Sequence, residues 1–268
     1  MKKDDITVAV ATHKPYEMPS DPCYLPLHVG SALHPEVCRG FRSDDEGENI
    51  SRLNDFYSEL TGMYWMWKNC GSDYKGLVHY RRHFRTSDLK ASRSTDRFER
   101  IATTEDYKAL FLASGCDAIV PAARDYFIDS IGGHYRSTMP GEQLDVCREV
   151  LCDLEPDYVK AFDGVLAGRK AHLFNMIVSK RDVFDAYCSW LFPVLEELCN
   201  RLNPSQYDAF NARYPGRVSE RLLDAWMTVN EIKWVEMPTV SPEPVDWIAK
   251  GSGFLAAKFF GKKYGRSF

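Results

Sequence analysis

A cluster of polar side chains suited to binding an anion follows a short apolar run in the first third of the chain. Residues 76–78 are a predicted buried strand. The cluster comes directly after it and consists of His79, Tyr80, Arg81, Arg82 and His83. In open α/β sheets, ligands bind beyond the carboxyl ends of the strands. Because the arginine fork matches phosphate oxygens, a diphosphate is the first candidate ligand.

The same cluster admits two other interpretations. Its arginines could be solvated, or could pair with acidic residues elsewhere in the chain. His79 and His83 have the four-residue spacing of a zinc-binding helix, but they follow a strand. Tyr80 also stands where the H-E-x-x-H motif has its glutamate. We therefore predict no metal ligands here.

Strand-like and helix-like segments alternate along the chain. Apolar runs of strand length cover 6–11, 76–78, 116–121 and 174–179, and the first of them leads into Thr12, His13 and Lys14. Helical spacing of apolar residues predicts helices over 51–70, 142–154, 183–202 and 217–226. This alternation predicts an α/β fold with a mostly parallel central sheet flanked by helices.

Three local features bear on where polar groups are placed. The segment 19–47 is rich in Pro, Gly, Asp and Ser and is a predicted ordered loop. The segment 132–137 is a predicted loop that carries His134 and Arg136. Ser219 is the predicted N-cap of the 217–226 helix, which puts Glu220 in its first turn.

Composition excludes several classes of protein. The 268 residues carry a formal net charge of −4, which argues against a general nucleic-acid binder. The eight cysteines show no C-x-x-C pair, and a chain of this size needs no disulfides, so we expect reduced thiols in a cytosolic protein. No apolar stretch is long enough for a membrane span.

The segment 246–268 contains five basic residues and no acid after Asp246, interleaved with aromatic residues. It suits an anionic membrane surface, although packing onto the domain is an equal alternative.

Several sequence motifs of nucleotide-binding and hydrolytic sites are absent, which limits the reactions that the chain can be expected to catalyse. The chain has no G-x-G-x-x-G after its first strand, no P-loop and no G-x-S-x-G elbow. A transferase with a nucleotide-activated donor needs cations for the leaving diphosphate and a carboxylate to deprotonate the acceptor. Glu220 is the first candidate for that carboxylate, with Asp224 and Glu142 behind it. Glu220 could equally serve only the electrostatics of a helix end.

Several blocks resemble one bacterial family. They are T-H-K (12–14), S-E-L-T-G-M-Y-W-M-W-K-N (58–69), G-L-V-H-Y-R-R-H-F (76–84), D-A-I-V-P (117–121), A-H-L-F-N-M (171–176), G-R-V-S-E-R-L-L-D-A-W (216–226) and K-F-F-G-K-K-Y-G (258–265). Together they are similar to domain-of-unknown-function family 4422, found among glycosyltransferases of capsular and exopolysaccharide biosynthesis. The resemblance implies a GT-A-like nucleotide-diphospho-sugar transferase fold over residues 1–245, and relatives are linked to transfer of galactofuranose or another hexose.

The resemblance also implies roles for individual residues. The nucleotide and diphosphate side of the site comprises Thr12, His13, Lys14, His79, Tyr80, Arg81 and Arg82. The donor or acceptor sugar side comprises His134, Arg136, His172 and Asn175. GT-A enzymes usually hold Mn²⁺ or Mg²⁺ with Asp-x-Asp, whereas this chain presents His79-Tyr80-Arg81, which leaves metal dependence open.

The function implied is sugar transfer from a nucleotide-diphosphate donor, with UDP the expected nucleotide, to a lipid-linked or oligosaccharide acceptor in capsule, exopolysaccharide or O-antigen synthesis. We expect a cytosolic protein that contacts the inner face of the plasma membrane through residues 246–268. Two alternatives remain: a non-catalytic module that binds an anionic glycan or lipid headgroup, and a nucleotide-sugar hydrolase. The residues leave the donor sugar, the acceptor, the anomeric outcome and the oligomeric state open.

Overall fold

A seven-stranded, mostly parallel sheet forms the centre of the molecule. The computed structural model describes residues 5–243. The strands, in spatial order, are β10 (Trp234–Met237), β6 (Ala118–Pro121), β9 (Ile177–Lys180), β4 (Tyr74–His79), β1 (Ile6–Thr12), β2 (Tyr24–His28) and β3 (Arg42–Ser43). Only β9 runs antiparallel to its neighbours β4 and β6, and the other pairs in the sheet are parallel. The predicted fold class is confirmed.

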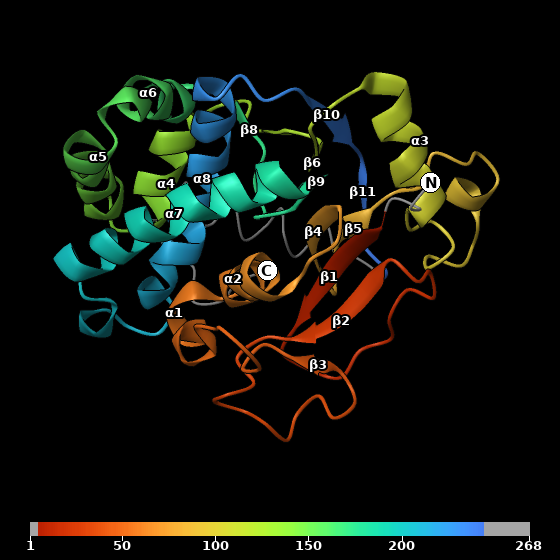
Figure 1. Ribbon diagram of the computed structural model, residues 1–268. Coiled ribbons are helices and arrows are strands. Elements are labelled where there is room, and N and C mark those ends of the chain that lie inside the picture. Colours follow the sequence, from red (N-terminus) through yellow and green to blue (C-terminus); the bar gives the residue numbers. More distant parts are fainter. Residues whose placement is uncertain (1–4, 244–268) are drawn as a thin grey trace.

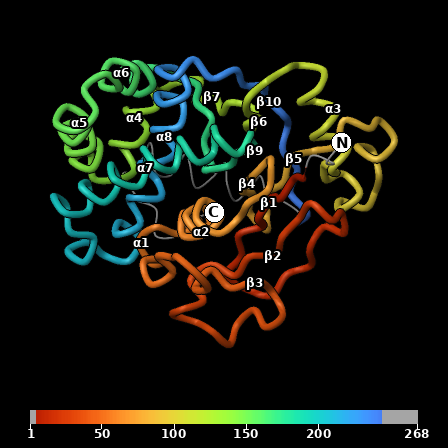
Figure 2. Tube along the Cα trace, viewed as in Figure 1, coloured from red at the N-terminus to blue at the C-terminus, as the bar shows by residue number. Residues whose placement is uncertain are grey.

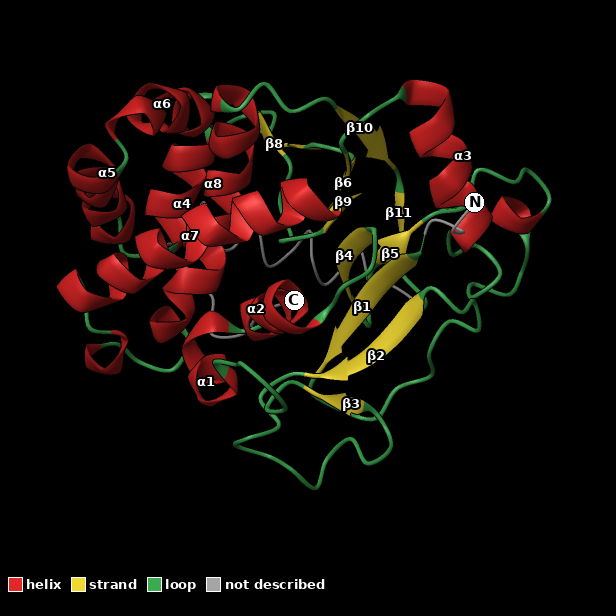
Figure 3. Ribbon diagram, viewed as in Figure 1, coloured by secondary structure: helices red, strands yellow, loops and turns green. Residues whose placement is uncertain are grey.

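Helices cover both faces of this sheet (Figures 1 and 3). They are α1 (Asn54–Tyr57), α2 (Leu60–Asn69), α3 (Thr104–Ser114), α4 (Ile131–Thr138), α5 (Glu142–Leu154), α6 (Val159–Ala167), α7 (Arg181–Arg201) and α8 (Tyr214–Val229). Two small antiparallel pairs complete the described strands, namely β5 (His83–Phe84) with β11 (Thr239–Val240), and β7 (Arg124–Asp125) with β8 (Lys170–Ala171). None of the helices within residues 5–243 is long and apolar enough to cross a membrane.

The alternation of side chains along a strand explains why both faces are covered. In β1, Val8 and Val10 lie in one apolar cluster, together with Tyr107 of α3. Ala9 and Ala11 lie in the other cluster, which includes residues of α2, α5, α7 and α8. Because both faces of the parallel strands are buried, the strands read in the sequence as continuous apolar runs.

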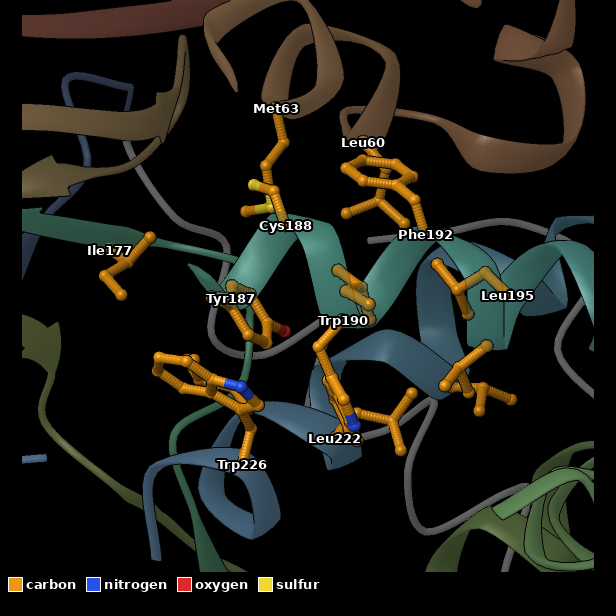
Figure 4. Packing of buried hydrophobic residues seen from close by; sticks show 14 of the residues in the cluster. Leu60, Met63, Ile177, Tyr187, Cys188, Trp190, Phe192, Leu195, Leu222 and Trp226 are labelled. Carbon is orange, nitrogen blue, oxygen red and sulfur yellow. The ribbon is translucent and has the colours of Figure 1, made fainter. Parts of the chain in front are cut away.

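The largest cluster is organised around α7, whose apolar side chains face two other helices. Figure 4 shows Met63 and Leu60 of α2 above α7, and Trp226 and Leu222 of α8 below it. Tyr187 of α7 and Trp226 pack with their ring centroids 5.2 Å apart. The helical spacing over 183–202 correctly predicted α7, and this helix holds α8 in place beside the sheet.

Two segments predicted as loops contain regular structure. Residues 19–47 include β2 and β3, which extend the sheet beyond β1, and Pro26 lies within β2. Residues 132–137 belong to α4, which begins after Ser130, whose side chain accepts a hydrogen bond from the amide of Gly133. Consecutive glycines suggested a loop, but Gly132 packs so closely on Leu166 that a Cβ there would lie 3.1 Å from its carbonyl oxygen.

Three predicted boundaries are also corrected. The helix expected over 51–70 is divided into α1 and α2 because Ser58 has a φ of 53°. The strand expected from residue 174 starts at Ile177, since Phe174 and Asn175 both have positive φ. The last predicted helix, α8, begins at Tyr214 rather than near Ser219. Glu220 therefore lies in the interior of α8, where helix-end electrostatics cannot account for it.

One glycine in the centre of the sheet offers a test of this packing. A Cβ at Gly76 of β4 would lie 2.7 Å from the Ile177 carbonyl oxygen and 2.7 Å from Cγ2 of Val178. We expect Gly76→Ala to lower the free energy of unfolding by about 1–3 kcal/mol, measured by urea denaturation. Gly71→Ala is the matched control because nothing lies within 4 Å of its Cβ position. Equal unfolding free energies for the two variants would contradict the strand register.

Candidate active site

Three chain segments meet at one edge of the sheet. β1 and β4 are parallel neighbours, with Ala11 opposite His79, so their carboxyl ends lie together (Figure 2). Because β9 is antiparallel to β4, its amino end reaches the same edge. The imidazole Nε2 of His79 donates to the Phe174 carbonyl oxygen across this junction, at 2.6 Å. Residues 12–14, 79–82 and 174–175 are thus brought together.

The turn after β4 presents two arginines. His79 and Arg82 exchange backbone hydrogen bonds of 3.1 and 2.9 Å, which close a tight turn. Arg81 is exposed, whereas Arg82 is half-buried and its guanidinium carbon lies 3.7 Å from the centre of the Phe174 ring. Burial lowers the pKa of Arg82, while the nearby Glu220 carboxylate acts in the opposite direction. Arg82 therefore lies close to the leading candidate base.

Tyr80 organises the cations around it. Its ring is buried and lies 5.1 Å from the Lys14 ammonium and 5.3 Å from the guanidinium carbon of Arg81. The ring of His13 meets it edge-on at 5.4 Å. An electron-rich ring face attracts cations, so Tyr80 holds Lys14 and Arg81 at the strand ends. It acts as support for the predicted phosphate-binding groups.

His13 lies close to several positively charged side chains. Burial lowers its pKa below 6.5, and Arg81, Arg213 and Lys14 lower it further by repulsion of the imidazolium.

Thr12 behaves differently from its neighbours: its hydroxyl is buried and donates to the Lys14 carbonyl oxygen at 2.7 Å. Thr12 shapes the turn, while His13 lies within the cationic region.

Phe174 and Asn175 form the junction between the sheet and α8. Their φ angles are 89° and 51°, in the left-handed region that costs a non-glycine residue about 1–3 kcal/mol. The Asn175 side chain secures this backbone. Its amide donates to Glu59 at 2.7 Å and to the Gly216 carbonyl oxygen at 2.8 Å, and its oxygen accepts from Ser219 at 2.8 Å. Asn175 was predicted to contact the donor or acceptor sugar. In the structure, both the nitrogen and the oxygen of its side-chain amide bind protein groups of this junction.

The strained backbone in turn orients Glu220. The Phe174 amide donates to Oε1 of Glu220 at 3.1 Å, and Arg221 donates to Oε2 at 2.5 Å. The Glu220 side chain keeps 21% of its surface exposed. Two donors hold the carboxylate while its remaining lone pairs stay available. This is the arrangement that a positioned proton acceptor needs.

Asp224 lies one helical turn further along α8 and has a different partner. Its carboxylate accepts from both the amide and Nδ1 of His172, at 3.0 and 2.6 Å. The other imidazole nitrogen of His172 donates to Glu236 at 3.0 Å. Burial lowers the pKa of His172, but the hydrogen bonds and charges of the two carboxylates outweigh it and raise the pKa overall. Asp224 and His172 thus form an ion-pair network that joins α8 to β10.

Other predicted residues lie apart from the strand-end cluster or contact its margin. Glu142 accepts a hydrogen bond from Tyr207, and Arg136 pairs with Asp145 of α5 at 2.7 Å. His134 packs against Tyr126, with ring centroids 4.4 Å apart. Burial lowers the pKa of His83 to about 4, and its Nε2 donates to the Tyr80 carbonyl oxygen at 3.4 Å. His83 is therefore neutral and internal.

Sequence reasoning did not identify three contributors to the site. Arg124 lies near enough to Arg82 to affect its pKa, and Arg213 has the same effect on His13. Arg213 follows no strand and precedes α8, so a search of strand ends could not find it. Glu59 was hidden within a predicted continuous helix, although it holds Asn175. Within residues 5–243, no group of three or more His, Cys, Asp or Glu side chains is arranged to hold a metal ion.

Comparisons with known proteins agree with this architecture. One solved structure, described as the WbbM bifunctional glycosyltransferase in its apo form, aligns with a TM-score of 0.78 and 27% sequence identity. The alignment covers 88% of this chain and 45% of WbbM, so this chain spans less than half of that protein. No curated protein matches the sequence.

The family comparison covers most of the sequence. The model of the family described as "Domain of unknown function (DUF4422)" matches residues 7–231, which run from the second residue of β1 to beyond the end of α8 and include the whole strand-end cluster. The chain thus belongs to the DUF4422 family, as the blocks at 12–14, 76–84 and 216–226 predicted.

Proposed function

We propose that this protein is a glycosyltransferase that takes a sugar from a nucleotide-diphosphate donor, with UDP as the expected nucleotide. One observation carries the proposal: Arg81 and Arg82 lie at the strand ends beside Glu220, whose carboxylate is oriented by hydrogen bonds from Phe174 and Arg221. The similarity to a solved glycosyltransferase supports it. The proposed acceptor is a lipid-linked or oligosaccharide glycan, and the sugar is galactofuranose or another hexose, following the family resemblance.

The cations account for the leaving group. Arg81, Arg82 and Arg124 can surround the diphosphate that departs when the glycosidic bond to phosphate breaks. Arginine binds phosphate through paired N–H donors, and Arg81 is exposed and so accessible to a ligand. In its protonated form His79 can also donate Nδ1–H to a phosphate oxygen, because Nε2–H is already committed to the Phe174 carbonyl oxygen. Charge neutralisation is thus assigned to this chain's own side chains.

Glu220 is the proposed base that activates the nucleophile, the acceptor hydroxyl. Its carboxylate accepts the proton of an acceptor hydroxyl, and the resulting oxygen attacks the anomeric carbon as the bond to the diphosphate breaks. Direct displacement of this kind inverts the anomeric configuration. The hydrogen bonds from Phe174 and Arg221 hold the carboxylate against rotation. The proposed setting of the reaction is the cytosolic side of a bacterial membrane during capsule, exopolysaccharide or O-antigen synthesis.

The first test removes one phosphate-binding cation. Arg81→Ala should weaken UDP binding about 10- to 100-fold, since a hydrogen bond to a charged group contributes about 1.5–3 kcal/mol. Isothermal titration calorimetry in EDTA measures the affinity. Arg148→Ala is the control, because Arg148 pairs with Asp163 on the helical side of the molecule. Unchanged UDP affinity in Arg81→Ala would refute the clamp.

The second test separates binding from chemistry. Glu220→Gln should bind UDP with wild-type affinity and lose about 100-fold or more in transfer rate, because the amide cannot accept the proton. Glu142→Gln should retain both, since the Glu142 carboxylate contacts Tyr207. Transfer is measured as UDP release that depends on an added acceptor. Acceptor-independent release would instead identify a hydrolase, and transfer by Glu220→Gln at the wild-type rate would exclude this base.

The third test uses the depressed pKa of His13. A bound diphosphate offsets the positive charge of Arg81, Arg213 and Lys14, so binding should raise the pKa of His13 and take up a proton. The affinity for a UDP-sugar, whose diphosphate has no titrating proton in this range, should therefore increase as the pH falls below about 6.5. Titrations in buffers of different ionisation enthalpy measure the proton uptake. His13→Asn should reduce it, and an identical uptake in wild type and variant would show that His13 is not coupled to the ligand.

A further inference from the structure

Two large apolar side chains are exposed beside the proposed active site. Phe127 and Ile128 follow β7 and have 76% and 62% of their surface exposed. Scattered single apolar residues are normal on a protein surface, whereas contiguous apolar surface with a polar rim marks an interaction site. We name residues 124–130 the β7 loop.

The loop is built to keep these two side chains outward. Tyr126 is buried with Ile131, Ala171 and Leu173 and anchors the base of the loop. Phe127 has a φ of 45°, an unfavourable conformation for an aromatic residue. Its amide donates to Asp125 at 2.8 Å, and its carbonyl oxygen accepts from Arg169 at 3.1 Å. The strained residue is thus clamped on both sides.

Exposed cations surround the apolar tip. Arg124, Arg169 and Lys170 are all exposed. The nearby carboxylates are partly used by the loop itself, since Asp125 accepts from the Phe127 amide and pairs with Lys170 at 3.5 Å, and Asp129 accepts from the Ser130 amide at 2.9 Å. The outer surface therefore combines an apolar tip with a basic rim. That combination is complementary to anionic lipid headgroups above an acyl layer.

The loop is also adjacent to the catalytic groups. Phe174 packs against the apolar cluster that contains Tyr126, and the Phe174 amide donates to Glu220 at 3.1 Å, so the base of the loop adjoins the proposed base. A membrane surface that contacts the loop therefore lies close to the proposed base and to the phosphate-binding cations. A lipid-linked acceptor has its reactive sugar just above a bilayer surface.

We propose that the β7 loop docks the protein on an anionic phospholipid bilayer, with Phe127 and Ile128 entering the acyl boundary and Arg169 and Lys170 contacting headgroup phosphates. The purpose of this docking rests on the proposed transferase function, since it brings the active site to a lipid-linked acceptor. The docking itself involves no nucleotide and is measured without one.

The test is co-sedimentation of the full chain with vesicles of phosphatidylcholine containing 30% phosphatidylglycerol, a composition chosen as roughly that of an anionic membrane. Phe127→Ser combined with Ile128→Ser should lower the vesicle partition coefficient about tenfold or more, because the variant has lost the two apolar side chains that transfer from water into the bilayer. Leu112→Ser, at an 88% exposed leucine of α3, should bind as wild type does. Arg169→Gln combined with Lys170→Gln should weaken binding at low salt and less at high salt.

A second readout locates the loop in the bilayer. Phe127→Trp should gain fluorescence quenching from lipids brominated in the acyl chain, whereas Leu112→Trp should not. Equal vesicle binding by the Phe127/Ile128 variant and wild type would overturn the proposal and assign any membrane contact to residues 246–268. If the Phe127/Ile128 variant bound vesicles as wild type does but no longer self-associated, the proposal would also be overturned. The loop would then be an interface between copies of the chain. Normal UDP affinity in the double variant separates failure of docking from failure of the donor site.

Discussion

The left-handed conformation of Phe174 and Asn175 is the constraint on which the proposed active site depends. The Asn175 amide bonds Glu59, Gly216 and Ser219 and so ties the start of β9 to α2 and α8. Phe174 then serves three groups at once. Its amide holds Glu220, its carbonyl oxygen holds His79, and its ring supports Arg82. A backbone strain of about 1–3 kcal/mol per residue persists because these surrounding contacts over-determine it. Base and phosphate-binding groups are therefore positioned by a single turn.

The antiparallel direction of β9 makes this arrangement feasible. A parallel strand at that position would bring its carboxyl end, not residues 174 and 175, to the edge where β1 and β4 end. Packing of α7 between α2 and α8 then places the middle of α8 against the turn (Figure 4). Glu220 is thus delivered from a helix interior, which is more rigid than a loop or a helix end. The charged network of His172, Asp224 and Glu236 fastens the same helix to β10.

The sequence predicted the elements whose apolar pattern is long or uninterrupted, and it failed where tertiary contacts override local preference. The apolar runs identified β1, β4 and β6, and the spacing over 183–202 identified α7. The direction of β9 could not be predicted, because direction depends on pairing rather than on composition. Ser219 resembled an N-cap, yet its hydroxyl bonds Asn175, 44 residues away in the chain. Arg213 and Glu59 reach the site only through the fold. The pattern could therefore nominate Arg81, Arg82 and Glu220, but not their common support.

The central claim is that the strand-end arginines hold a nucleotide diphosphate next to Glu220. A crystal structure of the protein with UDP tests it most directly. The account predicts phosphate oxygens within hydrogen-bonding distance of Arg81 or Arg82, with the β-phosphate on the side of Phe174 and Glu220. Phosphates bound away from residues 79–82, with Glu220 still closed onto Phe174 and Arg221 and remote from the ligand, would contradict it.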